Sequence, residues 1–146
     1  MKLVSACLLG IKCNWEGKDA YSQKVFDLYN TDFLIPVCPE IFGSLPTPRK
    51  PCGIYGSLAG QDSTIRSAGD GEDFTENFRR GANKILDIAK DLNIIEAVLK
   101  QTSPSCGCGR TWQLDDKFVN HKVPGDGVLA ALLKKNGIKV ITEEDL

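Results

Sequence analysis

Short apolar segments that resemble buried strands alternate with helical segments along most of the chain, and this alternation constrains the fold more than any other feature. The strand-like segments are KLVSA (2–6), FLIPV (33–37), IIEAVLK (94–100) and IKVIT (138–142). Short apolar runs of this kind are typical of strands that are buried on both faces of a parallel sheet. The order of the segments predicts an α/β layered fold of one domain over residues 1–146, Rossmann-like, with a mainly parallel sheet.

Three segments between these strands are expected to be helical. Residues 18–30 predict a weak helix, and Thr75 is expected to cap a stronger one. The apolar face of the stronger helix is formed by residues at steps of four and three: Phe78, Ala82, Ile85, Ala89 and Leu92. Asp126 is expected to cap the helix VLAALLKKN, which Gly137 ends.

Two further segments are assigned less regular structure. Residues 41–63 are rich in proline and glycine, which predicts a long ordered loop, and long loops in compact domains usually carry function. The segment WQLDDKFV predicts a short strand or a hairpin.

Charge and hydropathy exclude several classes of protein. The 146 residues carry a formal net charge of −1, with a pI near 5.8, which argues against a nucleic-acid partner. No apolar run approaches the length of a membrane span, and the start MKLVSACLLG is interrupted too early for a signal peptide. We therefore expect a cytoplasmic protein without a membrane partner.

The six cysteines are informative in a reducing compartment, where structural disulfides are not expected. Packing, metal binding or catalysis must account for them, because free cysteine is often simply buried. The chain has no CxxC pair, so a closed structural zinc site is not indicated.

Three of the cysteines follow strand-like segments. Cys7 and Cys38 come directly after the first two segments, and Cys106 lies in a loop after the third. The carboxyl ends of parallel strands share one edge of the sheet, where ligands bind. Three thiolates at such an edge suit zinc, copper(I) or an iron–sulfur cluster with one open position. Scattered core thiols and a redox thiol pair remain alternatives.

Polar residues near these cysteines are candidates for proton transfer or substrate contact. Glu40 follows Cys38 in CPE and places a carboxylate beside the expected metal, although it would also serve to cap a turn. Ser103 and Ser105 precede Cys106, where serines often satisfy backbone groups. Arg49 could bind a substrate oxygen through its planar guanidinium, or hold the long loop in place.

The same residues resemble a known family. The stretches SACLLG with CNWEG, VCPEIFGSLPTPRKP, GEDFTENFRRGA, LKQTSPSCG and GDGV are similar, in this order, to the DUF523 family, whose characterised branch is the thiouracil desulfidases. The resemblance covers nearly the whole chain, and the paired CPE and SPSCG motifs are its most specific part.

The resemblance implies an enzyme with a four-iron four-sulfur (4Fe–4S) cluster. Carried over by position, its three ligands are Cys7, Cys38 and Cys106, which leave one iron open, and its catalytic residues are Glu40 and Ser103. The implied reaction is the non-redox desulfuration of a thiolated pyrimidine (2-thiouracil, 4-thiouracil or a thiouridine nucleotide) to the oxo form and hydrogen sulfide. The substrate would be a small molecule: a base, nucleoside or nucleotide.

Several motif residues carry weaker expectations. Arg49, Ser105 and Asp126 are expected to contact the substrate, and the helix that begins near Asp126 could present its N-terminus to an anion. Cys52 and Cys108 depart from the family pattern. For Cys13 three roles are open: a residue that lines the site, a buried thiol, or a spare ligand. The remaining alternatives are a non-enzymatic metal- or sulfur-binding module and a thiol redox protein that pairs Cys106 with Cys108.

Overall fold

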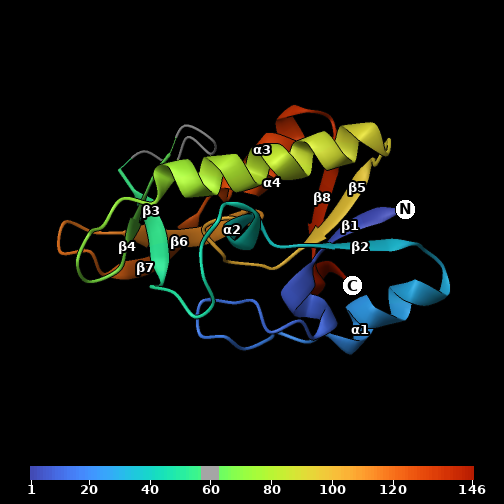
Figure 1. Cartoon of the computed structure of the whole chain (residues 1–146), viewed down its shortest axis with the longest axis horizontal. Coiled ribbons are helices and arrows are strands. Elements are labelled where there is room, and N and C mark those ends of the chain that lie inside the picture. Colours follow the sequence, from blue (N-terminus) through green and yellow to red (C-terminus); the bar gives the residue numbers. More distant parts are fainter. Residues whose placement is uncertain (57–62) are drawn as a thin grey trace.

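All four strand-like segments lie side by side in one parallel sheet of the computed structural model, which describes residues 1–56 and 63–146 (Figure 1). The strands follow the order β2 (Leu34–Val37), β1 (Lys2–Ser5), β5 (Glu96–Leu99) and β8 (Lys139–Thr142). Every neighbouring pair is parallel. The α/β layered fold with a mainly parallel sheet is thereby confirmed.

The position of β2 explains its proline. Pro36 lies opposite Val4 in the β1–β2 ladder, and β2 is the edge strand of this sheet. Proline has no backbone N–H to donate, so an edge strand, which leaves one side unpaired, accommodates it.

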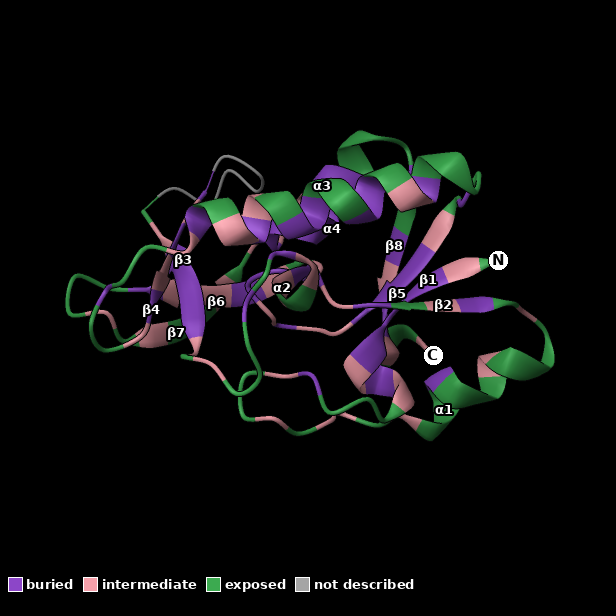
Figure 2. Cartoon of the chain, viewed as in Figure 1, coloured by how far each residue is buried: buried purple, intermediate pink, exposed green. Residues whose placement is uncertain are grey.

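Helices cover both faces of the parallel sheet (Figure 1). The long helix α3 (Thr75–Asp91) and α4 (Val128–Lys135) pack together over one face, while η1 (Ala6–Leu9) and α1 (Gln23–Phe26) lie on the other. The predicted apolar face of α3 is buried at Phe78, Ala82, Ile85 and Ala89 (Figure 2). Leu92, the fifth residue predicted for this face, is 45% exposed, because the helix ends at Asp91 and Leu92 lies beyond its last turn. Among the described residues, no helix has the length and apolar character needed to cross a membrane.

The helix predicted over residues 18–30 is shorter than expected. Only α1 and the following 3-10 turn η2 (Asp27–Asn30) are helical, and the Ser22 hydroxyl accepts the Val25 N–H to cap α1. Residues 18–22 instead form an irregular segment that is hydrogen-bonded to the turn after β1, for example from the Ala20 N–H to the Cys7 carbonyl.

A second sheet of mixed direction was not predicted. Its order is β4 (Thr64–Ser67), β3 (Cys52–Tyr55), β6 (Arg110–Leu114) and β7 (Asn120–Pro124). The predicted hairpin is present as the antiparallel pair β6–β7. The long-loop prediction for 41–63 is wrong at its first two residues, which end helix α2 (Pro39–Phe42), and where β3 runs. Residues 57–62 of that segment lie outside the described residues.

The strand β3 could not be predicted because it is short and pairs with β6, which is distant in the sequence. Its four residues are CGIY, and Ile54 and Tyr55 lie opposite Gln113 and Leu114 of β6 in a parallel ladder. Nothing local in a proline- and glycine-rich stretch signals such a pairing, because the stabilising partner is supplied by tertiary structure.

Neither predicted side-chain cap is formed. Helix α3 starts at Thr75, whose hydroxyl accepts the Ile65 N–H, while the Asp73 carboxylate accepts the Thr75 N–H. Helix α4 starts at Val128 after Gly127, without a side-chain cap. Gly137 does follow the end of α4 with a φ of 77°, as expected of a C′ glycine.

Close contact between α3 and the short helix α2 (Pro39–Phe42) depends on Gly81. A Cβ at Gly81 would overlap the carbonyl oxygen of Pro39. Helix α2 is the element that follows Cys38 and carries Glu40. The glycine in the middle of α3 therefore lets α2 approach closely enough to hold these two residues in place.

We expect Gly81→Ala to destabilise the protein by about 2 kcal/mol, because overpacking outweighs the gain in helix propensity of about 1 kcal/mol. Urea denaturation measures this change, and Lys84→Ala, an exposed position on the same helix, serves as a control expected to stay within about 0.5 kcal/mol. A more stable Gly81→Ala variant would show that α2 and α3 are not in such tight contact.

Candidate functional site

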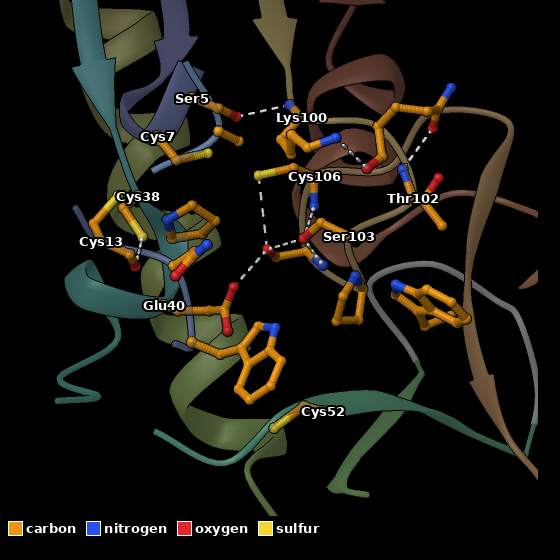
Figure 3. Close-up of a pocket in the computed structure, with 18 of the residues that line it drawn as sticks. Ser5, Cys7, Cys13, Cys38, Glu40, Cys52, Lys100, Thr102, Ser103 and Cys106 are labelled. Carbon is orange, nitrogen blue, oxygen red and sulfur yellow. Dashed lines mark hydrogen bonds between the residues drawn. The ribbon is translucent and has the colours of Figure 1, made fainter. Parts of the chain in front are cut away.

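The carboxyl edge of the parallel sheet carries the three predicted cysteines. Cys7 lies in η1 directly after β1, Cys38 lies between β2 and α2, and Cys106 lies in the loop after β5. All three line one cavity of about 530 Å³. Figure 3 shows them among the residues that line this cavity, with Glu40 and Ser103 nearby. The structure thus brings together cysteines that are up to 99 residues apart in sequence.

Part of the cavity wall comes from regions that sequence reasoning did not select. The mixed sheet supplies Arg110, Trp112, Asn120 and Lys122, and the irregular segment after η1 supplies Trp15. Trp15 stands in the CNWEG motif, so the motif did contain a signal for it. The other four became recognisable only when β6 and β7 were placed beside the cysteines.

The thiols of Cys38 and Cys106 are hard to ionise in the free protein. Burial raises the pKa of Cys106 to about 12, although the nearby hydroxyls of Ser5 and Ser105 lower it. The neighbouring Cys13 thiol and burial raise the pKa of Cys38 well above its ordinary value. Binding a soft metal centre would therefore have to displace protons from these thiols.

Cys13 is a fourth thiol at the same place. The hydrogen bond with Cys38 lowers its pKa, but contact with Cys7 and burial outweigh this and raise the pKa to about 11. The Cys38 thiol also lies 3.8 Å from the Cys13 carbonyl oxygen. Cys13 therefore borders the two N-terminal members of the cysteine trio.

The donor set fits an iron–sulfur cluster. Soft thiolates are the ligands that such clusters take, and the three cysteines face a cavity with room for a bound group. Among the residues that the structure describes, no three Cys, His, Asp or Glu side chains surround the position of a single metal ion. Thiolates that hold a cluster bind different irons and need not share one metal position.

The other two cysteines have different surroundings. Cys52 is buried on β3, lines the far part of the cavity and lies apart from the other thiols (Figure 3). Cys108 packs against the core, with its sulfur 3.7 Å from the Val140 carbonyl oxygen. It is absent from the cavity wall among the described residues. The thiols of Cys106 and Cys108 therefore do not face one another as a redox pair would.

Glu40 is held from one side by Arg49. The Arg49 side chain is only 4% exposed, and its Nε donates to Glu40 Oε1 at 3.1 Å. Its other nitrogens donate to the Cys13 carbonyl at 2.8 Å and to Pro46 and Thr47. Because each guanidinium nitrogen has a protein acceptor, the arrangement favours the loop-holding role of Arg49 and makes it a positioning residue for Glu40.

The SPSC turn presents two serine hydroxyls beside this carboxylate. Ser103 Oγ lies 2.9 Å from Ser105 Oγ, and Ser105 Oγ lies 3.2 Å from Glu40 Oε2. Ser105 also reaches the sulfur of Cys106 at 3.6 Å. Ser105, rather than Ser103, is therefore the serine in direct contact with Glu40.

The first turn of α4 holds the SPSC turn in position. The N–H groups of Val128 and Leu129 donate to the carbonyls of Pro104 and Ser105 at 3.0 and 2.8 Å. This N-terminus is therefore occupied by the protein's own backbone, and the expectation that it could receive an anion is wrong. Asp126 is absent from the cavity wall among the described residues; its carboxylate accepts the Gly109 N–H and the Lys134 ammonium.

Known proteins resemble the chain over its full length. It is 41% identical over 150 residues to the uncharacterized protein YbbK of Bacillus subtilis (strain 168). This alignment covers 100% of this chain and 97% of YbbK. The solved structure of the [4Fe-4S]-dependent thiouracil desulfidase TudS (DUF523Vcz) is 35% identical, with a TM-score of 0.86 over 99% of this chain and 91% of that one. The 2-thiouracil desulfurase family model matches residues 3–145, and the chain therefore belongs to the 2-thiouracil desulfurase family.

Proposed function

We propose that this protein is an iron–sulfur-cluster-dependent desulfidase that hydrolyses the carbon–sulfur bond of a thiolated pyrimidine, without net redox change, to the oxo base and hydrogen sulfide. The observation that carries the proposal is that three thiols, a carboxylate and two linked serine hydroxyls face one cavity at the sheet edge. Family membership and the likeness to the thiouracil desulfidase support it.

Cys7, Cys38 and Cys106 would hold the 4Fe–4S cluster with one iron open. When bound, the cluster would supply a Lewis acid for the thiocarbonyl sulfur, which polarises the carbon–sulfur bond. Glu40 is the group suited to take a proton from the attacking water, because it is an acceptor on the cavity wall and Arg49 fixes one of its oxygens. Ser103, which also lines the cavity, would orient the pyrimidine or relay a proton.

The cavity suits a small planar substrate. Its volume of about 530 Å³ lies in the range of small-molecule sites, and Trp15 and Trp112 add flat apolar surface to its wall. A free base, a nucleoside and a nucleotide share the thiolated ring that this site would bind. The substrate screen must therefore include all three.

Anaerobic protein reconstituted with iron and sulfide tests the proposal. We expect about four irons per chain and sulfide release from 2-thiouracil, 4-thiouracil or thiouridine monophosphate with no electron donor added. In water labelled with oxygen-18, the label should enter the oxo product, because hydrolysis takes its oxygen from water.

Two results would contradict the proposal. One is a colourless, iron-free protein after careful anaerobic reconstitution, without turnover of any of these substrates. The other is turnover that requires a reductant, because a hydrolytic step consumes no electrons. Bound metal without turnover would instead favour a non-enzymatic metal- or sulfur-binding module.

A further inference from the structure

We propose that Ser105 is a positioning residue that joins Glu40 and Ser103 into one directed hydrogen-bonded chain, so that the carboxylate acts at Ser103 through the Ser105 hydroxyl. This inference rests on the proposed function and deepens it. Ser105 Oγ lies 3.2 Å from Glu40 Oε2 and 2.9 Å from Ser103 Oγ, and therefore lies between the two groups expected to carry the chemistry.

The donor-to-acceptor direction of the hydrogen-bonded chain follows from the hydrogen bonds of Ser103. Its Oγ accepts the backbone N–H groups of Ser105 and Cys106, both at 3.2 Å. A hydroxyl has two acceptor lone pairs and one hydrogen, so both lone pairs of Ser103 are used. Ser103 must therefore donate its own hydrogen to Ser105 Oγ.

Ser105 then has one hydrogen and two acceptors within reach. Glu40 Oε2 lies at 3.2 Å and the Cys106 sulfur at 3.6 Å. A carboxylate oxygen is a much stronger acceptor than a thiol sulfur, and charge-assisted hydrogen bonds are the stronger ones. The hydrogen bonds consequently run from Ser103 to Ser105 and from Ser105 to Glu40.

Such a chain moves one proton without any other reagent than the attacking water. The Ser105 O–H bond breaks as a bond forms between that hydrogen and Glu40 Oε2, and the Ser103 hydrogen passes to Ser105 Oγ. Ser103 becomes an oxyanion held by two backbone N–H groups and takes a proton from the water, which leaves hydroxide to attack. The net change is one proton moved from water to Glu40.

Burial makes this role specific to Ser105. The residue is only 1% exposed, so its hydroxyl is not accessible to bulk water that could replace it. Arg49 fixes the other oxygen of the same carboxylate, and α4 holds the Ser105 carbonyl. The Ser105 hydroxyl is therefore fixed in place, because both its own backbone and the carboxylate that it contacts are held by the protein. A proton path requires such fixed positions.

The test compares Ser105→Ala with Ser105→Thr in reconstituted enzyme. We expect alanine to lower kcat about 100-fold with KM changed less than about twofold, and threonine, which keeps the hydroxyl, to recover kcat to within about tenfold of the parent. The matched control is Ser63→Ala, another buried serine, whose hydroxyl has no hydrogen-bond partner among the described residues and is absent from the cavity wall they form.

A double-variant cycle separates this chain from two independent contributions. If Glu40 acts through Ser105, adding Ser105→Ala to Glu40→Gln should slow the reaction by less than about threefold further. Multiplying effects would overturn the proposal, as would a Ser105→Ala enzyme with the kcat of the parent. A loss of kcat in step with lost iron would also overturn it, because Ser105 would then only support the Cys106 ligand.

Infrared spectroscopy gives a readout that does not depend on turnover. The difference between the parent and Glu40→Gln assigns the carboxylate bands of Glu40. Ser105→Ala should shift those bands, and Ser63→Ala should leave them unchanged. Unshifted bands in Ser105→Ala would refute the hydrogen bond itself, whereas absent sulfide release by the parent enzyme would refute the proposed function.

Discussion

Replacement of Glu40 by glutamine is expected to lower kcat for sulfide release by about 1,000-fold, within the range of general acid–base catalysis, while iron content is preserved. Glutamine keeps the size of the side chain and can still accept from Arg49 Nε, which lies 3.1 Å from Glu40 Oε1. Its amide group would then face Ser105 and donate where the carboxylate accepts. The variant thus removes the base and reverses a hydrogen bond without removing the fold.

Three measurements make this result interpretable. Iron and acid-labile sulfide analysis shows whether the cluster is retained, steady-state kinetics separates kcat from KM, and a thermal melt shows whether the fold is intact. Glu76→Gln is the matched control, because this carboxylate lies on α3 with 81% of its side chain exposed. If Glu40→Gln released sulfide at the parent rate, Glu40 would be only a structural partner of Arg49.

Serine in place of Cys7, Cys38 or Cys106 is expected to abolish the cluster and reduce activity to below about 1% of the parent. A serine hydroxyl is a hard oxygen ligand that stays protonated, whereas iron–sulfur clusters are bound by soft thiolates. Each variant should contain less than about one iron per chain, against about four in the parent. Iron analysis and the visible absorption of the cluster measure this loss, and both are independent of substrate.

The remaining cysteines provide controls for this prediction. Cys108→Ser should keep both cluster and activity, because the Cys108 sulfur faces the Val140 carbonyl rather than the cavity. Cys13→Ser is the more demanding control, since Cys13 borders Cys7 and Cys38. It should also retain the cluster; loss of the cluster in this variant would mean a fourth thiolate ligand and no open iron for the substrate.

Much of the site could be predicted because its cysteines follow strands that are recognisable locally. The apolar runs before Cys7, Cys38 and Cys106 indicated buried parallel strands, and the carboxyl ends of such strands lie at one edge whatever their order. Glu40 and the SPSC serines could be selected because they are close to these cysteines in sequence. None of these inferences required knowledge of which strands are neighbours.

The partners of those residues could not be predicted in the same way. Arg49 was expected either to contact the substrate or to hold the long loop, and its hydrogen bonds to Glu40 and the Cys13 carbonyl could not be predicted. Asp126 was expected to cap α4 and to contact substrate, but its carboxylate binds Lys134 and the Gly109 N–H. Side-chain hydrogen bonds depend on which elements pack together, and short sequence motifs do not contain that information.

The amino-acid sequence alone thus specifies the parallel sheet and the edge at which the thiols gather, because strand and helix periodicities are local properties of the chain. Folding in three dimensions adds the mixed sheet, which supplies part of the cavity wall, and the packing of α4, which holds the SPSC turn. It also sets the order Ser103, Ser105, Glu40 in the hydrogen-bonded chain. These features depend on contacts such as β3 with β6, whose partners are distant in sequence and are brought together only by the packed core.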